Sequence, residues 1–323
     1  MNDVKNPPPT HGLAHGRNSR RANRAVVIIL GQAVVIIGLI IALTAVVAAY
    51  NDDEEYISAE SSRVFEYFGE KDIIKLWDSA FGDTWLEALT DVPRHTYDFN
   101  NIKTRNGYKY YYQDGALASK VGIDVSYFQG DIDWQLVSDD GIEFVIIRLG
   151  YRGYESGAIN IDERFHEYIQ GAVDAGLDVG VYFYSQAVSA DEAEEEVLAV
   201  ISELGDYEIA YPIVYDWEVV GEDTARTNDV TVETLNECAS VFCNTIAGAG
   251  YIPMVYSSKR MALMKLDLSQ LAGFDFWLAE YNDEPEFPYN FTIWQYASDG
   301  EVNGIEGEVD LNISFVDYSL VRR

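Results

Sequence analysis

Two carboxylates at the end of one apolar run are the residues best suited to chemistry in this sequence. The run reads YPIVYDWEVV over residues 211–220 and places Asp216 and Glu218 two positions apart. In a β-strand, side chains two positions apart point to the same face, so both acids would lie together. Adjacent acids repel each other, and such electrostatic strain is found at catalytic sites more often than elsewhere. A strand that runs out into solvent would give the same pattern, so this run alone leaves both interpretations open.

Histidine and cysteine chemistry is largely excluded. Only two of the four histidines, His95 and His166, lie beyond the first 24 residues, so neither a histidine-rich metal site nor an HExxH protease is available. Cys238 and Cys243 are five positions apart in a helical pattern, beyond the reach of a disulfide. The sequence therefore predicts an enzyme without metal or cofactor, in which carboxylates and tyrosines do the work.

Eight short apolar runs, typical of buried strands, must position these acids. Helical segments with usable caps lie between the early runs, whereas the later connections are too short for full helices. This alternation predicts an α/β fold, a (β/α)₈ TIM-like barrel that is irregular and has few helices in its later half. The runs read VGIDVS, FVIIRLG, VGVYFYS, YPIVYDWE, IPMVYS, FWLAEY, FTIWQYA and VDLNISF.

The chemistry of such a barrel lies at the C-terminal ends of its strands. Asp216 and Glu218 end the fourth run, Asp124 lies near the end of the first, and Arg148 ends the second, where it could pair with one of the acids. Asp310 lies early in the last run. A shift of the strand boundary would therefore decide whether Asp310 joins the other acids.

The stretch before the barrel carries no recognisable chemistry. Residues 51–118 show apolar residues at helical spacing up to a break at Pro93, followed by the tyrosine-rich GYKYYYQDG. We expect an extracytoplasmic stalk or linker that is mostly helical. The predicted domain order is a basic tail at 1–24, an apolar span at 25–49, the stalk at 51–118 and the barrel at 119–323.

The span from Ala25 to Ala49 contains no charged residue and is long enough to cross a hydrocarbon core as a helix. Four arginines precede it and NDDEE follows it, so the positive-inside rule predicts a cytoplasmic N-terminus and an extracellular catalytic domain. We therefore expect a single-pass protein of the cell membrane. A cleaved signal peptide is the alternative, although its apolar region would be only about 7 to 15 residues long.

The formal net charge of −32 limits the class of partner. Binding of nucleic acid depends on Lys and Arg that neutralise phosphates, so an acidic surface argues against it. Nothing in the sequence predicts an oligomeric state.

Three stretches resemble one known family. They read GIDVSYFQGDIDW, then GVYFYS before PIVYDWE, then WQYA followed by VDLN. Together and in this order they resemble the lysozyme-type muramidases of glycoside hydrolase family 25, over roughly residues 120–320. The resemblance implies a flattened barrel that cleaves the β-1,4 bond between N-acetylmuramic acid and N-acetylglucosamine in peptidoglycan glycan strands.

The resemblance also implies roles for individual residues. Glu218 matches the general acid and Asp216 its partner on the same strand. Asp124 and Asp310 match two further active-site acids, and Tyr182 matches a tyrosine near the reacting sugar. A general acid must hold a proton near neutral pH, and burial among negative charges raises the pKa of a Glu to that range.

Four more residues are candidates for binding substrate. Many family members have Tyr-His-Phe where this chain has Tyr182, Phe183 and Tyr184, so Tyr184 stands close to the site without the histidine. Arg148 is the candidate cation. Trp294 and Tyr296 share one face of a strand and could border the cleft, although core packing explains their spacing equally well.

Two other functions fit the same residues. One is an inactive, membrane-tethered protein that only binds peptidoglycan. The other is a metal-dependent hydrolase on the same barrel, in which Asp216, Glu218 and Asp310 would supply oxygen ligands to Mg²⁺ or Ca²⁺.

Overall fold

The computed structural model describes residues 71–78 and 82–321. The predicted tail at 1–24, the predicted span at 25–49 and the first part of the predicted stalk lie outside these residues. Among the described residues, no helix has the length and apolar character needed to cross a membrane. The described residues from Ile74 onward form one compact unit, which contains every helix and strand named here apart from the first residue of β1.

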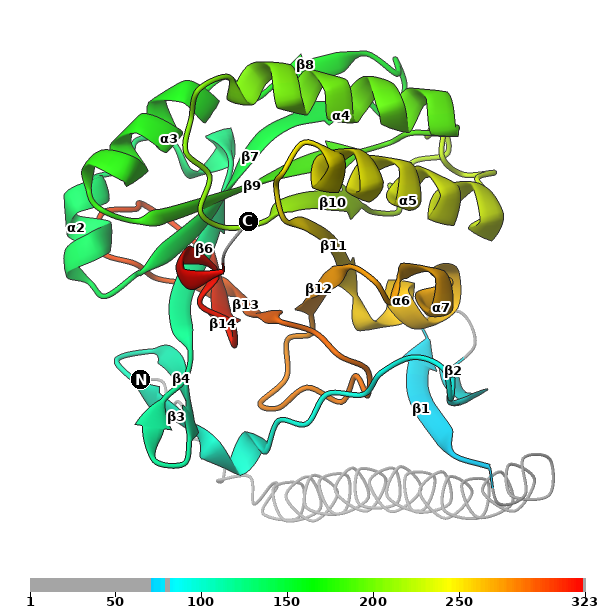
Figure 1. Cartoon of the computed structure of the whole chain (residues 1–323), viewed down its shortest axis with the longest axis horizontal. Coiled ribbons are helices and arrows are strands. Elements are labelled where there is room, and N and C mark those ends of the chain that lie inside the picture. Colours follow the sequence, from blue (N-terminus) through cyan, green and yellow to red (C-terminus); the bar gives the residue numbers. More distant parts are fainter. Residues whose placement is uncertain (1–70, 79–81, 322–323) are drawn as a thin grey trace, which may run out of the picture. The chain divides into compact units, whose positions relative to one another are not determined.

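Eight strands of the described chain close into a barrel (Figure 1), because β6 pairs with both β7 and β14. Each of the eight predicted runs forms one of them, so this part of the prediction is confirmed. A short strand, β8 (Ile159–Ile161), extends the end of β7 as an antiparallel hairpin. In order around the barrel, the strands are β6 (Lys120–Val125), β7 (Phe144–Arg152), β9 (Asp178–Ser185), β10 (Ile213–Trp217), β11 (Pro253–Ser258), β12 (Asp275–Ala279), β13 (Ile293–Gly300) and β14 (Val309–Ser314).

The last strand runs against the others. The strands from β6 to β13 pair in parallel with their neighbours in the barrel, whereas β14 is antiparallel to both β13 and β6. The predicted barrel therefore forms but differs in its last strand from a regular (β/α)₈ barrel, in which all eight strands are parallel. A strand of opposite direction presents its beginning where its neighbours present their ends. Asp310 consequently lies directly opposite Asp124 in the register, and no shift of strand boundary is needed to bring it there.

Helices cover the outer face of the early strands and become sparse later (Figure 1). Asp133, Ser189 and Thr231 cap α2, α4 and α5 by accepting backbone N–H bonds. Within the described residues no helix connects β12 to β13 or β13 to β14, as predicted for the later half. The helices are α2 (Trp134–Asp139), α3 (Phe165–Asp174), α4 (Ala190–Leu204), α5 (Val232–Gly248), α6 (Lys259–Lys265) and α7 (Leu268–Leu271).

The prediction of a mostly helical stalk is wrong for its described residues, which form strands and turns. Two-residue loops at Asn106–Gly107 and Asp114–Gly115 have positive φ at both positions, which is typical of tight β-hairpins. Asn-Gly and Asp-Gly dipeptides strongly favour a hairpin turn, and here they predict the structure better than the helical spacing of the apolar residues does. The elements are β1 (Ile73–Asp78), β2 (Gly82–Glu87), a 3₁₀ turn at Phe99–Asn101, β3 (Ile102–Arg105), β4 (Tyr108–Gln113) and β5 (Ala116–Leu117).

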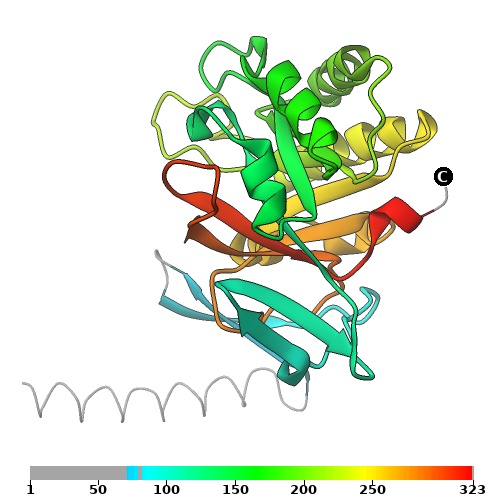
Figure 2. The same cartoon turned by 90° about the vertical axis from the view of Figure 1, so that its left-hand side faces the viewer.

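Residues 88–118 cover the outer face of the late strands, where helices are lacking (Figure 2). Tyr97 stacks on Phe315 with ring centroids 4.1 Å apart, and its hydroxyl donates to the carbonyl of Phe291 at 2.8 Å. Lys109 lies over the ring of Trp294 on β13, 4.9 Å from the centroid. Residues 88–118 therefore shield the outer face of β13 and β14 from water, as the helices shield the outer face of the early strands.

We expect a chain of residues 119–323 to be far less stable than one of residues 71–323. The shorter chain leaves Phe291, Trp294 and Tyr296 open to water, and each such side chain contributes about 1.5–3 kcal/mol when buried. A typical domain has only about 5–15 kcal/mol in total. Urea unfolding of both chains measures the difference, and Tyr97→Ala in the longer chain should shift stability in the same direction. Equal midpoints would show that residues 71–118 are only a linker.

Candidate active site

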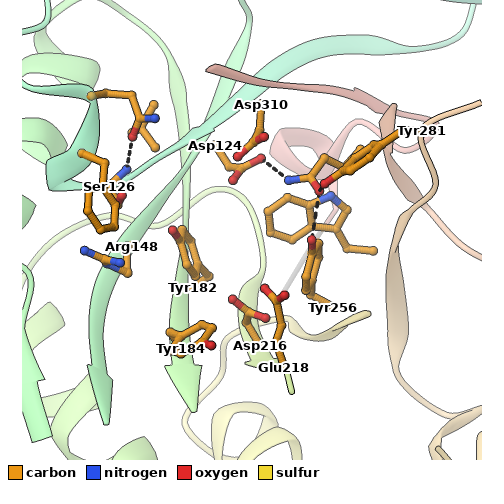
Figure 3. A pocket seen from close by; sticks show the side chains of 15 residues that line it. Asp124, Ser126, Arg148, Tyr182, Tyr184, Asp216, Glu218, Tyr256, Tyr281 and Asp310 are labelled. Atoms are coloured by element: carbon orange, nitrogen blue, oxygen red, sulfur yellow. Dashed lines mark hydrogen bonds between the residues drawn. The ribbon is translucent and has the colours of Figure 1, made fainter. Parts of the chain in front are cut away.

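One pocket of about 320 Å³ gathers most of the predicted site residues at the C-terminal ends of the parallel strands. Figure 3 shows the four acids facing this space together with tyrosines from β9 and β11. Of the nine residues predicted for the site, seven line the pocket: Asp124, Arg148, Tyr182, Tyr184, Asp216, Glu218 and Asp310.

Asp216 and Glu218 lie next to each other, as their spacing on one strand requires (Figure 3). Asp216 on β10 is in register with Tyr184 on β9 and Tyr256 on β11, so two tyrosines flank it. Its residue is only 5% exposed, whereas Glu218 follows the end of β10 and reaches solvent. Asp216 therefore lies deeper in the pocket than Glu218.

Burial and the charge of Glu218 raise the pKa of Asp216 well above its ordinary value. Desolvation and the charge of Asp310 raise the pKa of Glu218, whereas the hydrogen bond with Asp216 lowers it. Water at the open side of the pocket weakens the desolvation. The two carboxyls interact directly, so the second ionisation of the pair places two negative charges side by side. The pair therefore retains one proton at a pH where isolated carboxyls are ionised.

Asp124 and Asp310 form a second pair of acids on neighbouring strands. Burial and the charge of Asp310 raise the pKa of Asp124, while hydrogen bonds from Asn312 and Gln295 lower it. Burial raises the pKa of Asp310 as well. The pocket thus holds two carboxyl pairs on opposite walls, and each pair favours sharing a proton.

The side chain of Gln186 holds the backbone segment that carries Glu218. The buried amide of Gln186 donates from Nε2 to the carbonyl of Glu218 at 3.0 Å and to the carbonyl of Ser185 at 2.8 Å. Its Oε1 accepts from the hydroxyl of Thr227 at 2.9 Å. These bonds tie the end of β10 to the end of β9 and to the following loop.

Arg148 lines the pocket but does not pair with any of the four acids. It forms an ion pair with buried Asp162, with Nη2 2.7 Å from Oδ2. Its guanidinium also lies 5.0 to 5.4 Å from the ring centroids of Tyr127, Phe128 and Tyr151. The expected pairing is therefore corrected: the partner of Arg148 is Asp162, at the beginning of the loop before α3, a residue that the sequence pattern did not indicate.

Trp294 and Tyr296, the candidates that could border the cleft or pack in the core, do not line this pocket and are buried. Trp294 is fully buried and donates from Nε1 to the carbonyl of Glu280 at 2.7 Å. The hydroxyl of Tyr296 accepts from the backbone of Lys109. Gln295 between them faces the pocket, because successive side chains on a strand alternate between its faces. The two aromatic residues pack instead beneath residues 88–118.

Several pocket residues were not predicted. Tyr256 and Tyr281 lie near the ends of the fifth and sixth apolar runs, and the rule that located the acids would have found them. Phe128 is a strongly exposed aromatic residue in the stretch SYFQGD, directly after β6. Ser126, Gln129, Trp277 and Gln295 complete the polar and aromatic lining. Among the described residues, no group of three or more His, Cys, Asp or Glu side chains has the arrangement of a metal site.

Comparison with known proteins agrees with this geometry. The chain is 27% identical over 192 residues to the autolytic lysozyme of Clostridium acetobutylicum, covering 59% of this chain and 54% of that protein. It is 28% identical over 222 residues to lysozyme M1 of Streptomyces globisporus, covering 59% of this chain and 66% of that one. The chain thus spans only about half the length of the Clostridium relative.

Solved structures support the same fold. The modular autolysin LytC of Streptococcus pneumoniae superposes with a TM-score of 0.55 and 26% identity, covering 75% of this chain and 56% of LytC. A family 25 glycosyl hydrolase from Bacillus anthracis gives a TM-score of 0.52, with 22% identity and coverage of 66% and 95%. The model of the glycosyl hydrolases family 25 matches residues 123–305, which is more than half of the sequence. The chain therefore belongs to glycosyl hydrolase family 25.

Proposed function

We propose that this protein hydrolyses the β-1,4 bond between N-acetylmuramic acid and N-acetylglucosamine in peptidoglycan. The observation that carries the proposal is the pair of Asp216 and Glu218 in a family 25 pocket, facing a second pair of acids. Two similar proteins are named lysozymes, and LytC has also been solved in complex with a synthetic peptidoglycan ligand.

Glu218 is the general acid in this proposal. Its carboxyl reaches the open side of the pocket, so a glycosidic oxygen can approach it, whereas Asp216 is buried behind it. A bound glycan would displace water from Glu218 and raise its pKa further, which favours the protonated form needed for proton donation. The leaving sugar oxygen would take this proton as the glycosidic bond breaks.

Asp216 stabilises the positive charge that develops at the anomeric carbon. It would act either directly or through the 2-acetamido group of the substrate, and its low exposure strengthens the interaction because little water screens it. Asp124 and Asp310 face the same space and add negative potential. This potential both favours the cationic transition state and keeps the proton on Glu218.

Tyrosines and Arg148 orient the glycan. Burial raises the pKa of Tyr182 and of Tyr184, so both hydroxyls stay protonated and can donate hydrogen bonds to sugar oxygens. Arg148, held against Asp162, presents a rigid cationic wall. Sugar rings would be held by these groups in one orientation toward Glu218.

We propose further that residues 25–49 anchor the protein in the cell membrane, with the N-terminus in the cytoplasm and residues 51–323 outside. The proposal rests on the uncharged run and on the arginines before it. A hydrolase tethered in this way would act on peptidoglycan close to the membrane.

Digestion of purified peptidoglycan by residues 71–323 should create reducing ends on N-acetylmuramic acid, as mass spectrometry of borohydride-reduced fragments would detect. Glu218→Gln keeps the size of the side chain but cannot donate the proton, so kcat should fall by about 10²- to 10⁴-fold. Glu301→Gln changes an exposed acid outside the pocket and serves as the control. Cut peptide stems, or reducing ends on N-acetylglucosamine, would contradict the proposed specificity. Loss of activity after chelation would instead favour a metal-dependent hydrolase, and binding without turnover an inactive binding protein.

Asp216→Asn should lower kcat and also change its pH dependence. In the native pair, loss of the shared proton puts two negative charges together and therefore occurs at raised pH. With a neutral amide at position 216, Glu218 loses its proton at lower pH, so the alkaline limb of the kcat profile should move to lower pH. Rates measured from about pH 4 to 9 test this. An alkaline limb that stays in place would mean that Asp216 does not influence the proton of Glu218.

Protease added to intact cells that make the protein should remove residues 51–323 and leave the N-terminal tail protected, as detected with tags at both ends. A free catalytic domain in the medium, with its N-terminus near Tyr50, would contradict the anchor and identify residues 25–49 as a cleaved signal peptide.

A further inference from the structure

Two amide side chains converge on one oxygen of Asp124. Gln295 on β13 and Asn312 on β14 are partners in the strand register. Gln295 donates from Nε2, and Asn312 from Nδ2, to Oδ2 of Asp124, each at 2.8 Å. Both amides are buried, at 3% and 0% exposure, so water does not compete for these bonds. Oδ2 therefore receives two fixed N–H donors.

Groups that donate to the amide oxygens determine which way each amide points. Trp277 donates from Nε1 to Oδ1 of Asn312 at 2.8 Å, and an indole nitrogen can only donate. The hydroxyls of Tyr256 and Tyr281 both donate to Oε1 of Gln295 at 2.9 Å, which occupies its two lone pairs. Each amide must then turn its N–H₂ group toward Asp124. A reversed Gln295 would bring its oxygen against the carboxylate.

We propose that Gln295, oriented by Tyr256 and Tyr281, acts with Asn312 as a positioning residue that keeps Oδ2 of Asp124 free of a proton. The inference rests on the proposed function. A proton on Oδ2 would point at an amide hydrogen, so the proton of the Asp124–Asp310 pair must lie on the remaining oxygens of the two acids. The two N–H bonds also stabilise an ionised Asp124 more than a neutral one, so they oppose a second proton on the pair and keep one negative charge in the pocket.

The negative charge that Asp124 and Asp310 retain acts on Glu218, on the opposite wall of the pocket. Desolvation and the charge of Asp310 raise the pKa of Glu218. Without the two amide donors, burial of Asp124 would favour a second proton on this pair, and the pocket would lose that charge. The amides thus sustain the field that supports Glu218 and the cationic transition state.

Other charged and titratable groups also act on Asp124, and the test must separate their influence from that of Gln295. Asp310 faces it from β14, and the other groups come from the remaining walls of the pocket. These are Arg148 on β7, Tyr182 on β9, Asp216 and Glu218 on and after β10, Tyr256 on β11 and Tyr281 after β12.

Gln295→Glu tests the inference because it keeps the side-chain size and the acceptor for both tyrosines but removes the N–H donors. The acid limb of the kcat/KM profile reports protonation of acids that must stay ionised. We expect it to move to higher pH by about 1 to 2 units, since loss of one bond to a charged group changes an equilibrium by about 10- to 100-fold. Gln295→Leu should shift the limb in the same direction without adding a charge.

Tyr256→Phe/Tyr281→Phe provides a second test that leaves Gln295 in place. Without both hydroxyls the amide can reverse, so the acid limb should move the same way, and by more than the sum of the two single variants. This double variant decides the question if Gln295→Glu fails to fold, as judged by circular dichroism. Tyr154→Phe, outside the pocket, is the control.

The outcomes are distinct. An unmoved acid limb in folded variants, with kcat lowered equally at every pH, would overturn the inference and leave Gln295 a purely structural role. The wild-type protein is assayed first on the same peptidoglycan. If it produces no reducing ends at any pH, the proposed function itself is overturned.

Discussion

Antiparallel closure by β14 is the constraint on which the rest of the structure depends. Because β14 runs against β6, its first residues meet the end of β6 and set Asp310 opposite Asp124. The same pairing carries Asn312 into the pocket beside Gln295 of β13. A parallel last strand would place Asp310 at the opposite end of the barrel, away from Asp216 and Glu218, and the pocket would hold one pair of acids instead of two.

The two faces of the late strands serve different purposes. A parallel strand needs a long crossover, usually a helix that also covers the outside of the barrel, whereas an antiparallel one needs only a turn. The antiparallel connection from β13 to β14 therefore needs no helix, and the parallel connection from β12 to β13 contains none either. Residues 88–118 supply the missing cover. Trp294 and Tyr296 face this cover, while Gln295 between them faces the pocket. Strand β13 thus contacts residues 88–118 on one face and the pocket on the other. Stable packing of residues 88–118 on β13 therefore helps to hold the pocket residues in place.

Four carboxyls within one partly buried pocket oppose folding, because both desolvation and mutual repulsion disfavour their charges. The structure offsets part of this cost on one wall, where the amides of Gln295 and Asn312 donate to Asp124. On the other wall Oδ1 of Asp216 is buried without a hydrogen-bond partner. This difference suits two roles. The wall with Asp124 and Asp310 stays negatively charged, and the pair of Asp216 and Glu218 keeps a proton that can be donated. A site selected for activity commonly gives up stability in this way.

The order of strands, the sparse helices of the later half and the shared face of Asp216 and Glu218 could all be predicted, because local periodicity and spacing determine them. The hairpins at Asn106–Gly107 and Asp114–Gly115 could also have been read locally, since both dipeptides are turn signals. Other features depended on partners distant in the chain. The direction of β14 decided the place of Asp310, the cover from residues 88–118 decided which face of β13 is core, and Asp162 decided the partner of Arg148. A strand has the same sequence pattern whichever way it runs and whichever of its faces is covered, so only tertiary pairing could choose between these arrangements.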